Sequence, residues 1–277
     1  MWITSLGTDK IFFPIIEISP ADIALLKTGK PVKHKVIIIP GETFGTPPSW
    51  GLAFDAAGDL WVANASRGAI MKFRPNQIEK SGNPWPKLLI ASPAFFPGAI
   101  RFDASDNLWA IADDQVWRFA PRDRAASGPP NPSLRVDPPD GLSPMDFAFD
   151  SAGNLWLAGP GSSGDEIEMI SASDLTGTGE VSPTAAVTIT SSAFGVAVDS
   201  GTCLGGIDFD DSGDLWASVV GTVDTNPNCE SDTQLVEFTP SQLSTGGSLT
   251  PTVTIGQNST GTNLFLPGPL RFGRALK

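Results

Sequence analysis

The chain has 277 residues, among them no tyrosine, one histidine and two cysteines. The histidine, His34, lies between Lys33 and Lys35 in a segment that is expected to form an outer, solvated strand. A Ser-His-Asp arrangement is therefore not expected, because its histidine must lie against the nucleophile in a cleft. Cys203 and Cys229 have no histidine near them in the sequence, so they do not provide the ligand set of a zinc site.

Positive charge is also scarce, since 18 lysines and arginines stand against 30 acidic residues and give a net charge of −12 at pH 7. This balance argues against a nucleic-acid or anionic-membrane partner, because either would require a basic surface. No apolar run reaches the roughly 18 residues of a membrane-spanning helix. No signal peptide is visible, since repeat sequence begins at once after Met1.

What the chain does have is a repeat. Four segments share the pattern Phe-Asp, four further residues, and Leu-Trp, with Phe and Trp seven residues apart: 54–61, 102–109, 149–156 and 209–216. A fifth copy is divided between the chain ends, because Phe272 and Trp2 have the same spacing when Lys277 is joined to Met1. The sequence therefore predicts a ring of five repeats.

Each repeat contains four short stretches of alternating or β-branched residues, separated by turn residues. This pattern predicts an all-β fold, a β-propeller of five four-stranded antiparallel blades in a single domain over 1–277. The repeats are expected at about 1–47, 48–94, 95–141, 142–200 and 201–277. Segment 269–272 is expected to close the first blade by adding strand A to strands B, C and D from 1–39.

The segment after each Phe is expected to be a hairpin turn whose aspartate accepts hydrogen bonds from the local backbone. The alternative is a calcium loop, but the spacing lacks the alternating aspartates of such loops. The repeated tryptophan is expected to pack between blades rather than to bind a ligand. Two further acidic pairs, at 113–114 and 165–166, are expected to be solvated loop charges, with a cation site as the alternative.

Two distances in the repeat are constant and two vary. Phe to Trp is one constant, and the other is the 13 residues between the end of the second stretch and a later proline. In an antiparallel meander the two constant links, A–B and C–D, leave at one end of the blade, and the variable links, B–C and D–A, leave at the other. Because insertions collect on the working face of repeat proteins, function is expected on the B–C/D–A face. Neutral drift of loop lengths is the alternative.

Cys203 and Cys229 lie in the two longest variable links, which flank the same blade. A disulfide between them would constrain both loops and would indicate an oxidising, extracellular or periplasmic location. Two free, buried thiols are the alternative.

Candidate ligand-binding residues are those that depart from their repeat position: Trp50, Asn64, Arg101, Asp146, Asp208 and Arg271. Asp146 stands where other copies have small residues near the axis, and it is also the candidate metal ligand. Simpler roles are an Arg271–Asp208 pair lining the channel, a loop cap for Asn64 and loop packing for Trp50.

Segments 50–64 and 236–243 resemble the NHL-repeat type of bacterial β-propeller, within the broad regucalcin and virginiamycin B lyase-like superfamily. This resemblance implies a scaffold shared by lactonases, lyases and pure binding modules, and it says little about activity. Such relatives usually have six or seven blades. Their lyases use histidine or tyrosine as acid–base groups, which this chain cannot place near the axis.

We therefore expect a non-enzymatic, monomeric binding propeller that uses the B–C/D–A face for a protein or glycan and requires no cofactor. One alternative is a metal-dependent lactonase or hydrolase with carboxylates at the channel mouth and Ca²⁺ near Asp146. A second alternative is a structural or engineered repeat scaffold without a ligand.

Overall fold

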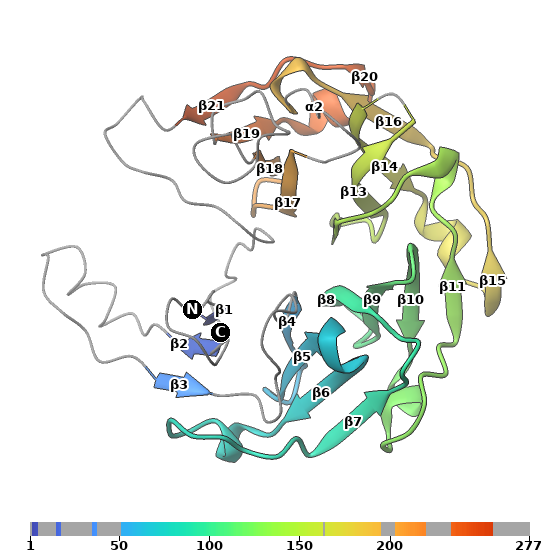
Figure 1. Ribbon diagram of the computed structural model, residues 1–277. Helices are drawn as coiled ribbons and strands as arrows, with labels where there is room; N and C mark the ends of the chain where they lie inside the picture. Colours follow the sequence, from blue (N-terminus) through green and yellow to red (C-terminus); the bar gives the residue numbers. More distant parts are fainter. Residues whose placement is uncertain are drawn as a thin grey trace, which may run out of the picture. The chain divides into compact units, whose positions relative to one another are not determined.

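A computed structural model describes residues 2–4, 15–17, 35–37, 51–162, 164–194, 203–219 and 234–256. Contacts within the chain divide it into two compact units. Unit 1 comprises Met1–Asp113 and Phe119–Asn131, and unit 2 comprises Asp114–Arg118 and Pro132–Lys277. Figure 1 labels the strands of both units.

Unit 1 is built from antiparallel strands that follow one another in sequence. A three-stranded sheet contains β1 (Trp2–Thr4), β2 (Ile15–Glu17) and β3 (Lys35–Ile37). A four-stranded sheet contains β4 (Gly51–Phe54), β5 (Leu60–Asn64), β6 (Ala69–Phe73) and β7 (Leu88–Ala91). Strands β8 (Pro97–Phe102) and β9 (Leu108–Ala112) form a further pair. The 3₁₀ helices here are Ala65–Arg67, Pro75–Gln77 and Pro121–Arg124.

Unit 2 has the same meander order. Strand β10 (Gln115–Phe119), whose last residue belongs to unit 1, pairs through Val116–Arg118 with β11 (Leu134–Val136). Strand β11 in turn pairs with β15 (Gly179–Val181). The next sheet contains β12 (Asp146–Phe149), β13 (Leu155–Gly161), β14 (Gly164–Ile170), β16 (Val187–Thr190) and β20 (Gly247–Ser248). The last contains β17 (Leu204–Phe209), β18 (Leu215–Val219), β19 (Gln234–Phe238) and β21 (Val253–Gly256). The helices here are α2 (Pro240–Leu243) and the 3₁₀ helices Pro139–Gly141, Ala172–Leu175 and Ser192–Phe194.

The structure corrects the predicted number of blades. Four sheets have four or five strands each, whereas β1–β3 form a sheet of only three short strands in the described part of the chain. The prediction of five four-stranded blades is therefore wrong. The strand that was expected to complete the first blade, at 269–272, lies outside the described residues.

The hairpin turn predicted after each Phe is confirmed in its four described copies. In each, one oxygen of the aspartate accepts two backbone N–H groups, as Asp55 Oδ1 does from Ala57 at 3.0 Å and Asp59 at 2.9 Å. The other oxygen accepts the indole Nε1–H of the Leu-Trp tryptophan, at 2.9 Å for Asp55 and Trp61. The equivalent bonds are Trp109 to Asp103 at 2.8 Å, Trp156 to Asp150 at 3.0 Å and Trp216 to Asp210 at 3.1 Å. Because these carboxylates are occupied by N–H donors, the hairpin interpretation holds over the calcium loop.

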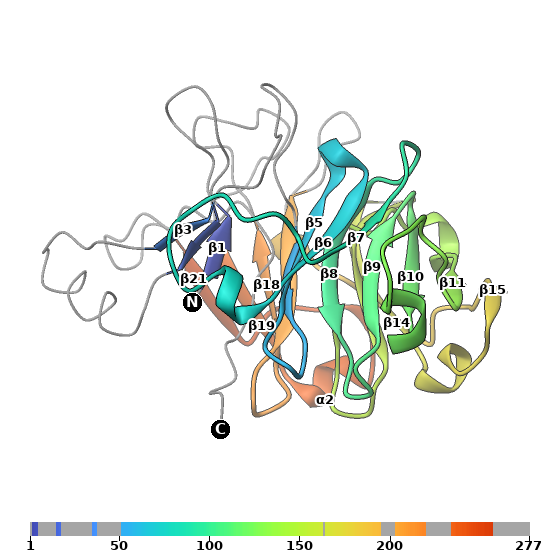
Figure 2. The same cartoon turned by 90° about the horizontal axis from the view of Figure 1, so that it is seen from below.

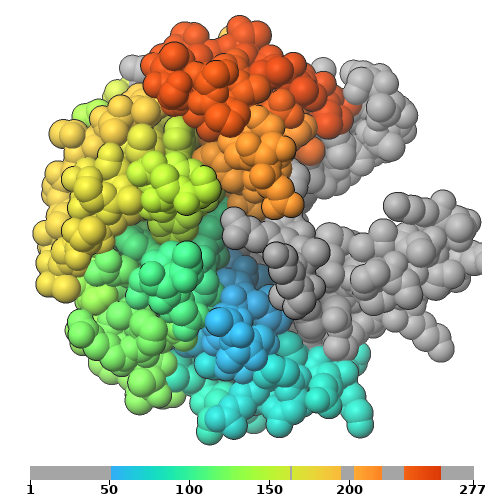
Figure 3. Space-filling model, turned by 180° about the vertical axis from the view of Figure 1, so that it is seen from behind, coloured from blue at the N-terminus to red at the C-terminus, as the bar shows by residue number. Residues whose placement is uncertain are grey.

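The tryptophans pack between successive repeats, as predicted. Trp61 meets Phe102 edge to face at 5.9 Å within unit 1, and Trp156 meets Phe209 at 5.8 Å within unit 2. Figure 3 shows β17 and β18, in orange, against the neighbouring yellow-green and red segments of unit 2. Their core joins Ile167, Phe194, Cys203, Ile207 and Val236 in one buried cluster. None of the helices in the part of the chain that the structure describes has the length and apolarity needed to cross a membrane.

The C–D links contact the edge of the preceding repeat, which was not predicted. Strand β15 pairs in parallel with β11, and β20 pairs in parallel with β16. In unit 1, Gly128 forms a parallel bridge to Ile90 of β7. Each of these segments satisfies backbone groups on an outer strand that would otherwise be an open sheet edge. We call them edge straps.

The two kinds of link leave a sheet at opposite ends. Figure 2 shows, in unit 1, the β4–β5 turn at one end of its sheet and the β5–β6 link at the other. In unit 2, β14 runs from Gly164 to Ile170 and pairs with β16 so that Glu166 lies opposite Thr190 and Met169 opposite Val187. The B–C hairpin and the start of the D–A link therefore meet at the Gly164 and Thr190 end.

Candidate functional site

Two of the predicted site residues lie in unit 1, where one has a clear structural role. Asn64 ends β5, is fully buried and caps the 3₁₀ helix Ala65–Arg67, because its Oδ1 accepts the Arg67 N–H at 2.9 Å. The simpler role proposed for it is thus present. Arg101 lies half-buried in β8, opposite Trp109 in β9.

Two others lie in unit 2. Asp146 begins β12, is fully buried, and its Oδ2 accepts the Ile207 N–H of β17 at 3.0 Å, which links two adjacent sheets. Asp208 lies half-buried in β17, opposite Trp216. No group of three acidic, histidine or cysteine residues in the described part of the chain is placed to hold a metal ion. The metal role of Asp146 stays a prediction.

The remaining predicted residues are Trp50, Arg271 and Cys229, which lie outside the described residues. Cys203 immediately precedes β17, is fully buried and packs in the core of unit 2. Among the described residues no cysteine is free. The Cys203–Cys229 pairing stays a prediction because its second member is not described.

A pocket opens at the B–C/D–A end of the β12–β16 sheet, where β14, β16 and β20 lie side by side (Figure 1). Its volume is about 190 Å³, and it is lined by Gly164, Asp165, Glu166, Thr190, Ser191, Ser192 and Ser248. We call it the β14–β16 pocket. Its lining consists of two carboxylates, four hydroxyls and a glycine, so it can accept hydrogen bonds and neutralise positive charge.

Asp165 and Glu166 are buried, with 8% and 9% of their surfaces exposed, so the prediction that they are solvated loop charges is wrong. The exposed pair Asp113 and Asp114 does have that role. The sequence placed 165–166 in a loop because it did not show that β14 begins as early as Gly164. The signal available was the alternation of Asp165, Ile167 and Met169 with Glu166 and Glu168, which continues the strand pattern to the hairpin.

Asp165 connects the pocket to the chain at Cys203 and Leu204, just before and at the start of β17. Its Oδ2 accepts the backbone N–H groups of Cys203 at 2.6 Å and Leu204 at 3.1 Å. Its Oδ1 is buried and has no hydrogen-bond partner in the described structure. One oxygen of Asp165 therefore holds the start of β17, and the other has no hydrogen-bond partner among the described residues.

Glu166 extends toward the hairpin tip. Its Oε1 occupies the space that a Cβ of Gly161 would need, so Gly161 cannot be replaced without moving this carboxylate. Burial raises the pKa of Glu166, and the nearby negative charge of Asp140 raises it further. No hydrogen bond to its side chain occurs among the described residues.

Glu168 lies two residues further along the same face of β14, opposite Leu157 and Thr188 in the flanking strands. It is 1% exposed, and both carboxyl oxygens are buried with no hydrogen-bond partner in the described structure. Burial first, and then the charges of Glu166 and Asp140, raise the pKa of Glu168 to about 7. Glu168 was not predicted as a site residue, although a glutamate at a strand position between Ile167 and Met169 was a visible signal.

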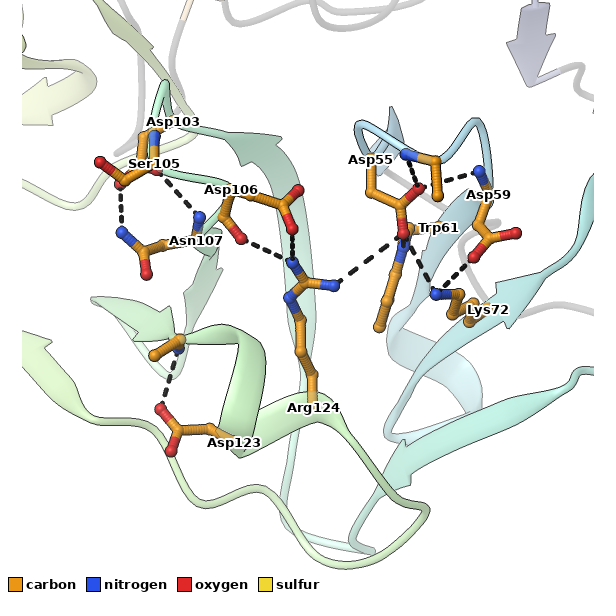
Figure 4. Close-up of polar contacts among 12 residues, drawn as sticks. Asp55, Asp59, Trp61, Lys72, Asp103, Ser105, Asp106, Asn107, Asp123 and Arg124 are labelled. Atoms are coloured by element: carbon orange, nitrogen blue, oxygen red, sulfur yellow. Dashed lines mark hydrogen bonds and ion pairs between the residues drawn. The ribbon is translucent and has the colours of Figure 1, made fainter.

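A contrasting polar cluster in unit 1 pairs acidic with basic side chains (Figure 4). Arg124 is buried and contacts Asp106 at 2.5 Å and Asp55 at 3.9 Å. Its guanidinium lies 5.2 Å from the Trp61 ring, and Lys72 lies 5.1 Å from the same ring while binding Asp55 and Asp59. Charges of both signs lie together here, whereas the charged side chains that line the β14–β16 pocket are both acidic.

Neither a protein-family model nor a curated protein sequence matches the chain. Solved structures do resemble it. The WD40 domain of coronin from Toxoplasma gondii aligns with a TM-score of 0.51 at 9% identity, covering 92% of this chain and 56% of that domain. Virginiamycin B lyase from Staphylococcus aureus aligns with a TM-score of 0.47 at 14% identity, covering 82% of this chain and 60% of the lyase. A protein of unknown function from Bacteroides caccae gives 0.47 at 12% identity, covering 82% of this chain and 69% of its own.

The repeated antiparallel meander and the likeness to the coronin domain define the class of protein: the chain is a β-propeller protein. Propellers with lyase, WD40 and extracellular-domain descriptions are among its structural neighbours. At these identities the likeness concerns the fold alone, and the function must be argued from the site.

Proposed function

We propose that this β-propeller is a non-enzymatic binding protein that uses its B–C/D–A face for a macromolecular ligand, a protein or a glycan. The observation that carries the proposal is the β14–β16 pocket, which lies at that end of its sheet and is lined by two carboxylates and four hydroxyls. Its volume of about 190 Å³ is below the roughly 300–1,000 Å³ of small-molecule sites. A site of this size suits part of a larger ligand that also contacts the surrounding surface.

The test compares two exposed serines, each in a 3₁₀ helix of the same unit. Ser192 lines the pocket, and Ser173 follows β14 at the opposite end of the sheet. Ligands would be selected from displayed peptides and from immobilised oligosaccharides. We expect Ser192→Trp to abolish binding of the selected ligand and Ser173→Trp to leave it unchanged. Equal binding by both variants would contradict a site on the B–C/D–A face.

The hydrolase alternative has its own test. A panel of lactones with added Ca²⁺ or Mg²⁺ is expected to show no turnover above buffer. Turnover that Asp146→Asn abolishes, while the circular dichroism spectrum is retained, would establish the alternative. Asn is chosen because it keeps a side-chain oxygen to accept the Ile207 N–H, whereas Ala would remove the link between β12 and β17.

We further propose that Cys203 and Cys229 form a disulfide and that the protein acts outside the cytoplasm. Two observations support this: Cys203 is buried and is not a free cysteine, and the chain contains one other cysteine with which it could pair. Mass spectrometry without reductant should detect a peptide that joins both cysteines. For a loop of this length the bond would contribute about 3–4 kcal/mol, so reduction should lower the denaturation midpoint markedly. Two alkylatable thiols in the native protein would contradict the bond.

A further inference from the structure

We propose that the β14–β16 pocket binds a single lysine or arginine side chain of a basic protein partner, with Glu166 as its counter-ion. This inference deepens the proposed binding function and rests on it. It concerns the chemistry of the partner, which the proposed function leaves as protein or glycan.

Glu166 is the pocket residue to which a cation would bind. More than nine-tenths of this residue is buried, it lines the pocket, and no donor within the described residues hydrogen-bonds its side chain. Its carboxylate oxygens keep some access to solvent through the pocket, but a residue so largely buried has few water partners for its charge, and a charge-assisted hydrogen bond from a cation would supply one. Nearby Asp140 adds negative charge, so a cation that enters is attracted by more than one group.

The pocket suits an ammonium or guanidinium group better than a metal ion. Asp165 and Glu166 are adjacent in β14, so they leave the strand on opposite faces, and no three acidic side chains here are placed around one metal position in the described structure. An ammonium or guanidinium group needs no such coordination sphere, because it donates three or five separated hydrogen bonds. The hydroxyls of Thr190, Ser191 and Ser192 provide further acceptors around the pocket.

The size of the pocket and the net charge of the protein both favour a basic protein segment. The pocket has room for one long side chain rather than for a separate ligand. The net charge of −12 raises the local concentration of basic partners and speeds their association. A neutral glycan would gain neither from the net charge nor from the buried carboxylate, so the observations favour a basic protein segment.

The experiment uses the full-length protein and three pentapeptides: Gly-Gly-Lys-Gly-Gly, its arginine analogue, and the lysine peptide acetylated on its side chain. Titrations are followed by the amide NMR signals of Gly164–Glu166, Thr190–Ser192 and Ser248, with affinities taken from the same data. We expect the two cationic peptides to shift these signals and the acetylated peptide to leave them unchanged. Glu166→Gln should weaken cationic-peptide binding by roughly tenfold or more, since it removes one charge-assisted contact.

Two controls keep the result interpretable. Glu79→Gln removes an equal charge from an exposed position in unit 1 and should not change the affinity. Ser192→Trp should block the pocket sterically while leaving both carboxylates in place. Thermal melting of each variant shows that the fold is retained.

The outcomes separate this proposal from the broader one. Equal binding of the acetylated peptide, or a Glu166→Gln variant that binds as wild type does, would overturn the cation site. Pocket signals that move with a neutral oligosaccharide and not with the cationic peptides would overturn it too, while supporting the proposed binding function. If neither peptides nor oligosaccharides move signals on the B–C/D–A face, both proposals fail.

Discussion

The aspartate after each repeated Phe has two tasks. One oxygen closes the turn through backbone N–H groups, and the other fixes the indole of a tryptophan six residues later. Residue types at turn positions were enough to predict the first task. The second was missed, although the unchanging distance between Asp and Trp was its signal, because nothing local in the sequence shows that a strand returns its side chain to the turn.

The four copies differ in how much depends on this aspartate, and this yields a prediction. Asp55 also binds Lys72 at 3.2 Å and lies 3.9 Å from the buried Arg124, whereas Asp150 has no cation contact among the described ion pairs. Burial alone would raise the pKa of Asp55, but hydrogen bonds from Trp61, the Asp59 backbone and Lys72 together lower it.

Asp55→Ala would leave Arg124 without one of its two carboxylates, so we expect it to lower the free energy of unfolding by about 3–5 kcal/mol. Asp150→Ala should cost about 1–3 kcal/mol. Urea denaturation measures both, and equal losses would contradict the special position of Asp55.

Glu168 gives a prediction about pH. Its native pKa of about 7 exceeds the ordinary value of 4.5, so between these values the native state holds a proton that the unfolded state has lost. Stability therefore falls as pH rises through this window, and the full cost above pH 7 is about 3 kcal/mol. Glu166, whose pKa is also raised, adds a dependence of the same sign. Glu168→Gln should flatten the decrease in unfolding free energy between pH 5 and pH 8, measured with urea at each pH.

The exposed Glu79 serves as the control, because Glu79→Gln changes the net charge equally and should keep the wild-type pH profile. A Glu168→Gln profile parallel to that of the wild type would show that this carboxyl does not titrate with a raised pKa.

At the scale of elements, alternation and turn residues predict most strands correctly, as in β4–β7 and β17–β19. The edge straps were not predicted, because their pairing joins segments that are distant in sequence and have no alternation of their own. Their signal was the constant C–D length of 13 residues. A link that must reach the edge of the preceding repeat at a fixed register cannot change length, whereas the B–C and D–A links are free of this requirement.

The strap at Gly128 can be tested with a matched pair of substitutions. Gly128 donates its N–H to the Leu89 carbonyl at 3.0 Å and accepts the Ala91 N–H at 3.0 Å. No atom lies within 4 Å of the position of a Cβ here, so Gly128→Ala should be neutral or slightly stabilising. Gly128→Pro removes the N–H and should cost about 1–3 kcal/mol. Hydrogen exchange at the Ala91 amide should accelerate in the proline variant alone, and unchanged protection there would show that the strap does not hold the edge of β7.

At the scale of the whole molecule, the sequence period counts repeats, but a blade requires paired strands. Five copies of the Phe and Trp pattern exist, yet the first contributes only the three-residue strands β1, β2 and β3 to the described structure. Strand number per sheet also differs from four where a strap adds β15 or β20. Local patterns do not specify these edge pairings, which depend on which segments of the folded chain meet.

The net charge leads to a prediction for the molecule as a whole. At pH 7 the charge of −12 makes self-repulsion the larger electrostatic effect, and added salt screens it. Raising NaCl from 10 to 200 mM should therefore raise the melting temperature, by roughly 2–4 °C if the gain is about 1 kcal/mol.

Near pH 4.4 the net charge vanishes, while attractive pairs such as Arg124 with Asp106 and Lys72 with Asp59 are still screened by salt. The same addition of NaCl should then lower the melting temperature or leave it unchanged. Thermal unfolding followed by circular dichroism, repeated with KCl to exclude a specific ion, tests this reversal. A rise in melting temperature of equal size at both pH values would show that the salt acts by some route other than screening the net charge.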